Sequence, residues 1–380
     1  MAYLISEEAK DLVDAVREFC ENEVKEQSKE YDRTGEWPKE IYDMAMEMQL
    51  HMLEIPEEYG GLGLDKLTCA ALYEEMARAD AGFALTFAVS NIDLTPVMKF
   101  GTEEQKKRFC DIILSGKFGA FALTEPQAGS DAANGKTTAR KDGDYYILNG
   151  RKTFITNGGV AGVYLVTAMT DKSKGLKGMS AFIVEADTPG LSTGHHEDKM
   201  GIRGSNTCDV VFDECRIPAS ALLGKEGEGF KIAMLTLDVS RTFVGCMVIG
   251  IAQRAMEEAI KYSKERVQFG KPIAKQQAVA FMIADMEIKI ETARQMVAHA
   301  CTLMEEGKPY GMESAIAKCY GGDVAMQVTT DALQVFGGYG YSRDYPVEKL
   351  MRDAKIYQIF EGTNQIQRVV IANHLMNKYN

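Results

Sequence analysis

The period of the hydrophobic residues changes twice along this chain of 380 residues, and no other feature constrains the fold as strongly. Apolar residues recur at helical spacing up to about residue 118. From there to about residue 225, short β-rich runs alternate with glycine turns, and long helical periodicity returns at Gly229. The sequence therefore predicts an α+β chain with a helical domain at 1–118, an antiparallel β domain at 119–225 and a helical bundle at 226–380.

The first part is predicted to hold several helices ahead of a buried apolar run. Ser6 followed by two glutamates is typical of a helix start, and apolar residues then recur at helical spacing over 12–24. Further helices are predicted at 38–48 and 67–79. The run at 83–100 is apolar enough to lie in the core.

One acid, Asp93, interrupts the apolar run at 83–100. A buried carboxylate costs free energy unless it is paired, solvated or useful. In one reading, Asp93 is the N-cap of a helix that Pro96 begins, since aspartate is a common cap. In the other reading it is a functional carboxyl inside a pocket. The residues alone leave both readings open.

The β part carries one strong turn signal. Asn149-Gly150 lies between two β-rich runs and predicts a hairpin. Further strands are predicted at 163–169, 179–184 and 207–212. The loop at 121–131 offers hydroxyls and a glycine-containing backbone to a ligand, whereas the loop at 199–206 is interpreted as a polar turn.

The third part contains long amphipathic helices. An apolar stripe at 248–260 faces a charged side, as in a bundle helix with one solvated face. Ahead of this stripe, Asp238 and Arg241 stand one turn apart, so they can pair with each other or hold a polar ligand together. A second long helix is predicted at 277–306, ended by Gly307.

Near the C-terminus a lone carboxylate, Glu361, follows an apolar run and precedes a glycine. Thr363 or Asn364 then stands where a helix N-cap is expected, and the N–H groups of a helix start attract an anion or an electron-rich ring. Gly362 lets a flat ligand approach the backbone. The local pattern allows Glu361 to be a solvated residue at a helix start, or a base whose apolar neighbours raise its pKa.

Composition argues against several classes of function. The 55 acidic and 43 basic residues give a net charge of −12, which does not suit non-specific nucleic-acid binding. The eight cysteines have no paired spacing, so neither a metal site nor a disulfide framework is predicted. We find no run of 18 apolar residues and no basic leader ahead of an apolar core, and we expect a cytoplasmic protein without membrane insertion.

Five blocks, in this order on a helical, β, helical chain, resemble the flavin-dependent acyl-CoA dehydrogenases. They are FALTEPQAGSD at 121–131, FITNG at 154–158, RVQFG at 266–270, QVFGG at 334–338 and YQIFEGTNQ at 357–365. The likeness extends from end to end and implies that family's fold, with an N-terminal helical domain, a middle β domain and a C-terminal four-helix bundle. It also implies FAD as cofactor and a homotetramer built as a dimer of dimers.

The resemblance implies which residues hold FAD. The first two blocks would lie against the flavin ring and the pyrophosphate, with Thr156 toward flavin N5. The family holds FAD across a subunit contact, so the third and fourth blocks would serve the partner subunit's cofactor. The implied FAD-binding residues are Phe121, Leu123, Thr124, Gly129, Ser130, Phe154, Ile155, Thr156, Arg266, Gln268, Phe269, Gln277, Gln334, Val335, Gly337, Gly338, Thr363 and Gln365.

The resemblance also assigns the base. Glu361 occupies the place of the glutamate that removes an α-proton from the acyl-CoA while hydride leaves the β-carbon for the flavin. Some relatives carry their glutamate at the position of Ser240 instead, and a serine cannot do that work. The implied substrate-binding residues are Ser130, Asp238, Arg241, Glu361 and Gly362.

The acyl group itself stays open. We expect a short straight-chain substrate such as butyryl-CoA, with electron-transferring flavoprotein as the electron acceptor. The alternative is an alicyclic thioester, cyclohexane- or cyclohex-1-ene-1-carboxyl-CoA, for which Asp93 would be a second catalytic carboxylate. Two further alternatives are an enoyl-CoA reductase that works in the opposite direction and a redox-inert acyl-CoA-binding protein.

Overall fold

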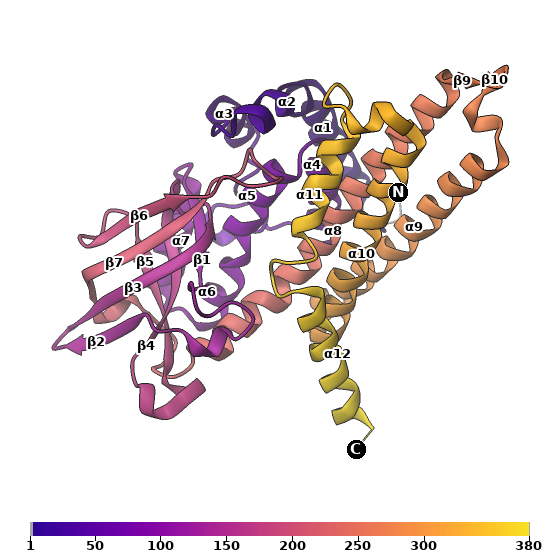
Figure 1. Cartoon of the computed structure of the whole chain (residues 1–380). Coiled ribbons are helices and arrows are strands. Elements are labelled where there is room, and N and C mark those ends of the chain that lie inside the picture. The colour runs from indigo at the N-terminus through magenta and orange to yellow at the C-terminus, as the bar shows by residue number, and fades with distance from the viewer. Residues whose placement is uncertain (1–2, 380) are drawn as a thin grey trace.

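The computed structural model of the protein describes residues 3–379. Helices come first, a β-sheet follows and a helical bundle ends the chain, in the order that the periodicity predicts. Figure 1 shows the sheet on one side of the molecule and the bundle on the other. The long helix α8 (Gly229–Glu265) runs from the sheet into the bundle and connects the two halves.

Side-chain N-caps begin several of the N-terminal helices, including the one predicted at Ser6. Ser6 caps α1, and its side chain accepts a hydrogen bond from the backbone N–H of Ala9. Asp80 caps α5 in the same way, accepting from the N–H of Phe83 at 2.9 Å. The helices are α1 (Glu7–Phe19), α2 (Lys25–Thr34), α3 (Lys39–Glu47), α4 (Lys66–Ala79), α5 (Ala81–Ile92), α6 (Leu94–Phe100) and α7 (Glu103–Leu114), with a π-helix (Cys20–Val24) between α1 and α2.

Asp93 lies at the joint between α5 and α6. Helix α6 begins at Leu94, so Asp93 does occupy the N-cap position. Its side chain makes no cap hydrogen bond, and its φ and ψ are already helical at −74° and −18°. The interpretation of Asp93 as a side-chain cap is therefore wrong, because the backbone passes from α5 to α6 without the extended cap residue that would direct the carboxylate at the helix start.

Within residues 3–379 the sheet has eight strands in the order β6-β7-β3-β2-β4-β5-β8, with β1 paired to β4. Most neighbours are antiparallel, as predicted, but β4 pairs in parallel with β1 and, at one residue pair, with β2. The crossover from β1 to β4 passes through two strands and is long enough for parallel pairing. The strands are β1 (Phe118–Ala122), β2 (Thr138–Asp142), β3 (Tyr145–Thr156), β4 (Ala161–Met169), β5 (Met179–Glu185), β6 (Leu191–His196), β7 (Thr207–Pro218) and β8 (Leu222–Leu223).

The hairpin predicted at Asn149-Gly150 does not form. Both residues lie inside β3, where the register against β7 shifts between Leu148 and Gly150. The Asn149 amide donates to Oε1 of Glu214 at 2.7 Å and accepts from its backbone N–H at 2.8 Å. A bulge held by side-chain hydrogen bonds to the neighbouring strand therefore replaces the turn that the dipeptide predicts.

The C-terminal bundle is built on α8 and α10. Helices α8 and α9 match the predicted periodicity, and α9 ends one residue before the predicted end at 306. Helices α10 and α11 pack against α8 but were not singled out in the sequence. The remaining elements are α9 (Gln277–Glu305), α10 (Gly311–Phe336), α11 (Val347–Ile356), α12 (Asn364–Lys378), β9 (Val267–Gln268) and β10 (Lys271–Pro272).

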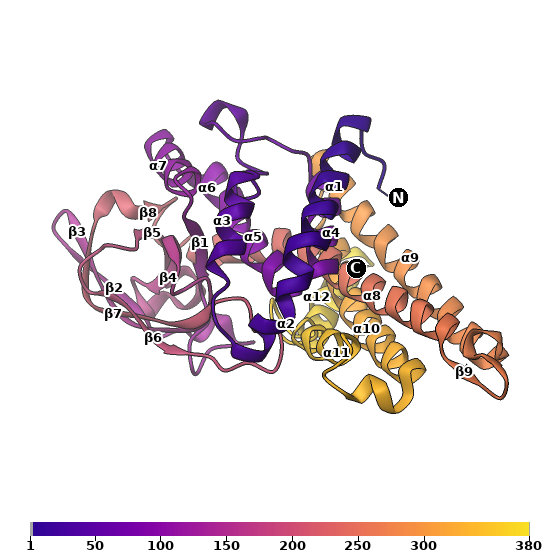
Figure 2. The ribbon, with the colours of Figure 1, turned by 90° about the horizontal axis from the view of Figure 1, so that it is seen from above.

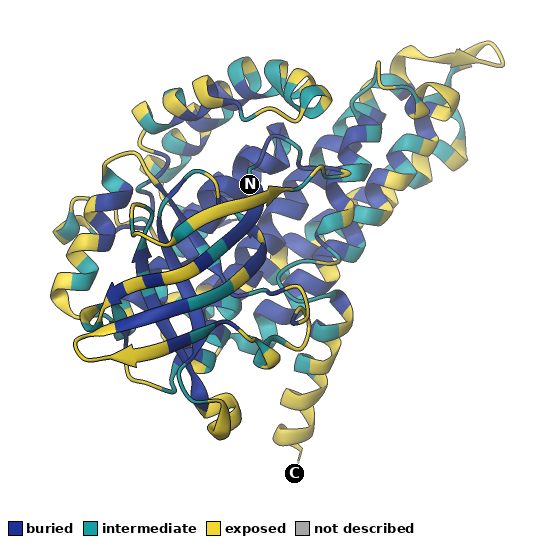
Figure 3. Ribbon diagram, turned by 60° about the vertical axis from the view of Figure 1, so that its left-hand side comes forward, coloured by how far each residue is buried: buried dark blue, intermediate teal, exposed yellow. Residues whose placement is uncertain are grey.

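The bundle is buried in the middle and exposed at its far end. Figure 3 shows α8 mostly buried along its middle, while the β9–β10 hairpin and the end of α12 are exposed. Seen from above in Figure 2, this hairpin lies at the end of the bundle away from the sheet. Two stretches, Ala81–Phe100 and α8, are long and apolar enough to cross a membrane, but 89% and 78% of their apolar 18-residue windows are buried inside the fold. Their place in the core accounts for their composition.

The bulge at Gly150 leads to a prediction about stability. A Cβ at this position would lie 2.5 Å from Oγ1 and 2.7 Å from Cα of Thr137, so the backbone must shift. We expect Gly150→Ala to lower the free energy of unfolding by about 1–3 kcal/mol, measured by urea denaturation. Gly204→Ala is the control, because its Cβ would meet only atoms at 3.8 Å or beyond. Equal stability of both variants would contradict this interpretation of the bulge.

Candidate active site

Glu361 lies in the turn between α11 and α12, and Figure 1 shows this turn on the side of the bundle that faces the sheet. Its φ is +55°, in the left-handed region, and the φ of the following Gly362 is +81°. A non-glycine residue rarely adopts this conformation unless its surroundings hold it there, and such positions cluster at functional sites. The turn therefore requires contacts from neighbouring elements.

Helix α12 supplies the first set of contacts. Thr363 is its N-cap and accepts the N–H of Ile366 at 3.1 Å, which decides between the two predicted cap residues. Gln367 is fully buried and donates to the backbone carbonyls of Glu361 and Gly362, at 3.0 and 2.9 Å. The start of α12 thus folds back onto the turn and fixes both of its residues with positive φ.

Helix α10 supplies a buried cation beneath the turn. The Lys318 ammonium donates to the carbonyl of Gly362 at 2.7 Å and to Oδ1 of Asn364 at 3.0 Å. Burial lowers the pKa of Lys318 to about 8, and the charge of Glu361 opposes this shift. Lys318 was not among the predicted site residues, although a lysine inside the largely apolar run at 315–319 is a usable signal.

The Glu361 carboxylate points to α8. The Ser240 hydroxyl donates to Oε2 of Glu361 at 2.7 Å, a role that the sequence analysis also missed. Burial raises the pKa of Glu361 above its ordinary value, against the Ser240 hydrogen bond and the charges of Arg241 and Lys318. A half-buried carboxyl of this kind is suited to act as a base near neutral pH.

Asp238 and Arg241 pair with each other on α8. Arg241 donates to Oδ1 of Asp238 at 2.6 Å, and the arginine side chain is only 5% exposed. A Cβ on Gly362 would lie 3.9 Å from the Arg241 guanidinium, so the pair is adjacent to the turn. Of the two predicted arrangements, the structure contains the ion pair, and its position beside Glu361 still allows it to contact a ligand.

Asp93 is fully buried, and neither of its carboxylate oxygens has a hydrogen-bond partner among the described residues. Burial raises its pKa well above the ordinary value, and the charge of Glu361 raises it further. Asp93 is therefore close enough to Glu361 to sense its charge. Both effects favour the protonated form of Asp93.

The first two predicted blocks lie together at one end of the sheet. The N–H of Thr153 donates to the carbonyl of Thr124 at 2.9 Å, which joins the loop after β1 to β3. Phe154 is 62% exposed and has a φ of +56°, so the backbone holds an aromatic ring out of the sheet. A Cβ on Gly129 would meet no atom within 4 Å. A bare backbone beside an outward-facing ring fits a flat, phosphate-bearing cofactor.

The other predicted residues of these blocks differ in exposure. Leu123 and Ile155 are buried, Phe121 and Thr156 are half-buried, and Ser130 is exposed. In the last block, Thr363 is half-buried and Gln365 is exposed. The exposed and half-buried residues are available to a ligand, whereas Leu123 and Ile155 can contribute only through their backbone or by packing.

The third and fourth blocks form a separate groove at the far end of the bundle. Its volume is about 580 Å³. The lining residues are Tyr262, Arg266, Gln268, Ile273, Val335, Phe336, Gly337, Gly338 and Tyr339. Of the remaining predicted residues, Phe269 is 94% exposed at the hairpin tip, and Gln277 and Gln334 are exposed but do not line the groove. None of the residues that line this groove belongs to the turn that carries Glu361.

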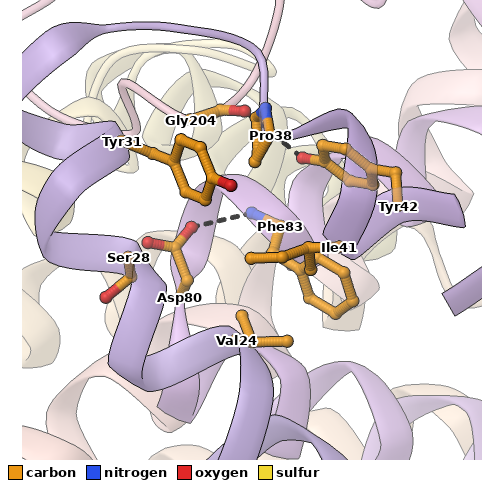
Figure 4. A pocket seen from close by; sticks show the side chains of 9 residues that line it. All are labelled: Val24, Ser28, Tyr31, Pro38, Ile41, Tyr42, Asp80, Phe83 and Gly204. Atoms are coloured by element: carbon orange, nitrogen blue, oxygen red, sulfur yellow. Dashed lines mark hydrogen bonds between the residues drawn. The ribbon is translucent and has the colours of Figure 1, made fainter. Parts of the chain in front are cut away.

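A second pocket, among the N-terminal helices, is too small for a substrate. It lies between α2, α3 and α5 and holds about 10 Å³, room for about one water molecule (Figure 4). Beside it the Tyr42 hydroxyl donates to the carbonyl of Gly204 at 3.4 Å, and Asp80 accepts from Phe83. This pocket is a gap between packed side chains and not the active site.

A buried cation next to this pocket joins all three parts of the chain. Lys349 of α11 donates to Asp80 at 2.8 Å and to Asp353 at 2.6 Å. Asp353 in turn accepts the backbone N–H of Ile202, in the loop before β7, at 2.6 Å. The loop at 199–206 is therefore tied to α5 and α11 and is more than a polar turn.

Three family models match nearly the whole chain: the acyl-CoA dehydrogenase N-terminal domain at 6–117, the middle domain at 120–215 and the C-terminal domain at 227–376. The chain belongs to the acyl-CoA dehydrogenases. The family predicted from the five blocks is confirmed. Acyl-CoA dehydrogenases are FAD-dependent flavoproteins that dehydrogenate acyl-CoA thioesters, and this enzyme shares that activity and cofactor.

Individual relatives of this acyl-CoA dehydrogenase support a short acyl chain. The chain is 46% identical over 382 residues to the short-chain specific acyl-CoA dehydrogenase of Megasphaera elsdenii, covering 99% of this chain and 100% of the relative. It is also similar to the solved butyryl-CoA dehydrogenase of Megasphaera elsdenii, with a TM-score of 0.96, 46% identity and coverage of 99% and 100%. These likenesses favour dehydrogenation of straight-chain thioesters over the alicyclic, reductase and redox-inert alternatives.

A third similar protein is a solved structure from Acidaminococcus fermentans. The chain matches one in the solved structure described as the electron transferring flavoprotein of Acidaminococcus fermentans, with a TM-score of 0.96, 49% identity and 99% coverage of both chains. Among the described residues no group of three or more His, Cys, Asp or Glu could hold a metal ion.

A buried ion pair supports the loop at 121–131 of this acyl-CoA dehydrogenase. Lys152 of β3 donates to Oε1 of Glu125 at 2.8 Å and to the carbonyl of Leu123 at 3.0 Å. Although burial raises the pKa of Glu125, the charge of Lys152 and hydrogen bonds from the backbone lower it to about 2. The loop at 121–131 is thus held to β3 by a paired, hydrogen-bonded carboxylate.

We expect Lys152→Met to lower the free energy of unfolding by about 3–5 kcal/mol, because it leaves the Glu125 carboxylate buried without its cation. The Glu125 pKa of about 2 lies below its unfolded value. Its contribution is therefore complete above about pH 4.5 and is lost as the pH falls toward 2. The difference in the free energy of unfolding between wild type and Lys152→Met, measured by urea denaturation, should therefore become smaller as the pH falls through this range. Lys141→Met, at an exposed lysine, is the control, and a difference independent of pH would contradict the pairing.

Proposed function

We propose that this enzyme dehydrogenates a short straight-chain acyl-CoA such as butyryl-CoA, and that Glu361 is the base that removes the α-proton. The observation that carries this proposal is the half-buried Glu361 carboxylate with a raised pKa, in a turn held by α8, α10 and α12. The short-chain specificity of the Megasphaera elsdenii relative supports the chain length.

The turn contributes more than the base. An α-proton of a thioester is weakly acidic, so the site must stabilise the negative charge that develops on the thioester oxygen. The backbone N–H of Glu361 has no acceptor among the described residues. We propose that it donates to this oxygen, while the Arg241–Asp238 pair and Ser130 hold the CoA portion. FAD, when bound, supplies the acceptor for the β-hydride.

The two ends of the molecule would form one cofactor site only in an oligomer. We propose that the loop at 121–131, the end of β3 and the start of α12 bind the flavin ring of one FAD. The groove at the β9–β10 end would then complete the site of the partner subunit, since none of the residues that line it belongs to the turn that carries Glu361. This arrangement supports a dimer of dimers. We further propose a cytoplasmic location and electron-transferring flavoprotein as the electron acceptor, supported by the Acidaminococcus fermentans neighbour.

Replacing the base tests the function directly. We expect Glu361→Gln to lower the rate of flavin reduction by butyryl-CoA about 10²–10⁴-fold, because the amide cannot accept the proton. FAD content and acyl-CoA binding should stay at wild-type levels. The measurement is anaerobic stopped-flow bleaching of the flavin absorbance, with Glu58→Gln, at an exposed loop position, as the control. Reduction at the wild-type rate in Glu361→Gln would rule out the proposed base.

Asp93 is proposed to have a role different from that of Glu361. We propose that it lies beside the acyl group as a protonated carboxyl, since burial and the Glu361 charge both favour that form. Asp93→Asn keeps its shape and neutrality, so kcat/KM for butyryl-CoA should change by no more than about threefold. An ionised second base would instead lose about 100-fold or more. Steady-state kinetics on both proteins distinguishes the two roles.

A further inference from the structure

We infer that Ser240 is a positioning residue of the reaction: its hydroxyl holds Oε2 of Glu361 and stabilises the ionised carboxylate until Oε1 has taken the α-proton. The inference rests on the proposed role of Glu361 as the base. It goes further because it states which oxygen of Glu361 takes the proton and which group stabilises the ionised carboxylate beforehand. Ser240 exchanges no proton with the substrate and is not itself a catalytic residue.

The geometry separates the two carboxylate oxygens. Ser240 is 2% exposed on α8, and its Oγ lies 2.7 Å from Oε2 of Glu361. No other described residue forms a hydrogen bond with this carboxylate, since Arg241 is bonded to Asp238 and Lys318 to the backbone and side chain of the next turn. Oε2 is therefore anchored, and Oε1 is the oxygen left free to meet the α-carbon.

The Ser240 hydroxyl has one proton and two acceptors within reach. Besides Oε2 of Glu361, it lies 3.1 Å from the backbone carbonyl of Leu237, one turn earlier on α8. An ionised carboxylate is the stronger acceptor, so the proton favours Glu361 while the base is charged. Once Oε1 has bound the α-proton, the carboxyl becomes a weaker acceptor, and the hydroxyl can turn to Leu237. The Ser240 hydrogen bond thus stabilises the ionised form of Glu361 and breaks after the α-proton has been transferred.

The charges around Glu361 decide the sign of the effect. Burial raises the pKa of Glu361, and the Ser240 hydrogen bond, Arg241 and Lys318 oppose that shift. Asp93 is the acid that senses the Glu361 charge. Without the hydroxyl, two opposing groups, Arg241 and Lys318, remain, so the pKa of Glu361 must rise further. A smaller fraction of the base is then ionised at neutral and acidic pH.

The test compares Ser240→Ala, Ser240→Thr and wild type as FAD-loaded enzymes. For Ser240→Ala we expect the acid limb of kcat/KM for butyryl-CoA to move up by about one pH unit, so that activity falls about tenfold on that limb and recovers at high pH. Ser240→Thr keeps a hydroxyl and should restore the wild-type limb. Ser263→Ala is the matched control, since Ser263 is a buried serine of α8 that donates only to the carbonyl of Ile260.

A second readout does not depend on turnover. Infrared difference spectra taken across a pH titration report the Glu361 carboxylate, identified as the band missing in Glu361→Gln. This band should titrate at higher pH in Ser240→Ala than in wild type. Superimposable profiles and bands in the two proteins would overturn the inference. If Glu361→Gln is inactive while Ser240→Ala behaves as wild type, the inference alone fails; if Glu361→Gln is fully active, the proposed function fails as well.

Discussion

The carboxylate of Glu361 must keep a charge in a half-buried turn, and much of the molecule is arranged around that constraint. Removal from water disfavours the ionised form, and the opposing contributions come from outside the turn. Helix α8 provides the Ser240 hydroxyl and the Arg241 charge, and α10 provides Lys318. A base held this way has a higher pKa than a solvated glutamate and is still able to ionise, the balance that abstraction of a weakly acidic proton needs.

The contacts that act on the Glu361 carboxylate also require the three parts of the chain to stay packed in a fixed arrangement. Lys349 is buried between Asp80 and Asp353, and the latter holds the N–H of Ile202. This cluster ties an N-terminal helix, the bundle and a loop of the sheet into one contact. Removal of one member would leave a buried charge without its partner, a costly state. The turn that carries Glu361 starts one residue past the end of α11, the helix that carries Lys349, so the cluster also fixes where the base stands relative to the sheet.

Sequence patterns predicted the features that depend on neighbours along the chain. The order of the domains, the cap at Ser6 and the two long helices α8 and α9 follow from periodicity and capping. The hairpin at Asn149-Gly150 failed because hydrogen bonds to Glu214, 65 residues away, override the turn signal. Only the family resemblance assigned Glu361 a catalytic role, since the local pattern was also typical of a solvated residue at a helix start.

The partners of Glu361 could not be predicted from the sequence, because they are far from it along the chain. Ser240 is 121 residues away along the chain, and Lys318 is 44 residues from the Gly362 carbonyl that it holds. No spacing rule connects such positions before the fold is known. Asp93 is the intermediate case: an acid inside an apolar run was visible in the sequence, but the choice between a cap and a pocket carboxyl needed its burial and its unpartnered oxygens.

Exchange of the α-hydrogen in heavy water tests the central claim most directly. An acyl-CoA with sulfur in place of the β-carbon can lose its α-proton but offers no β-hydride, so the experiment isolates the base from the redox step. The account predicts that the FAD-loaded enzyme incorporates deuterium at the α-carbon, and that Glu361→Gln stops this incorporation while still binding the thioester. Incorporation at an unchanged rate without the Glu361 carboxylate would contradict it.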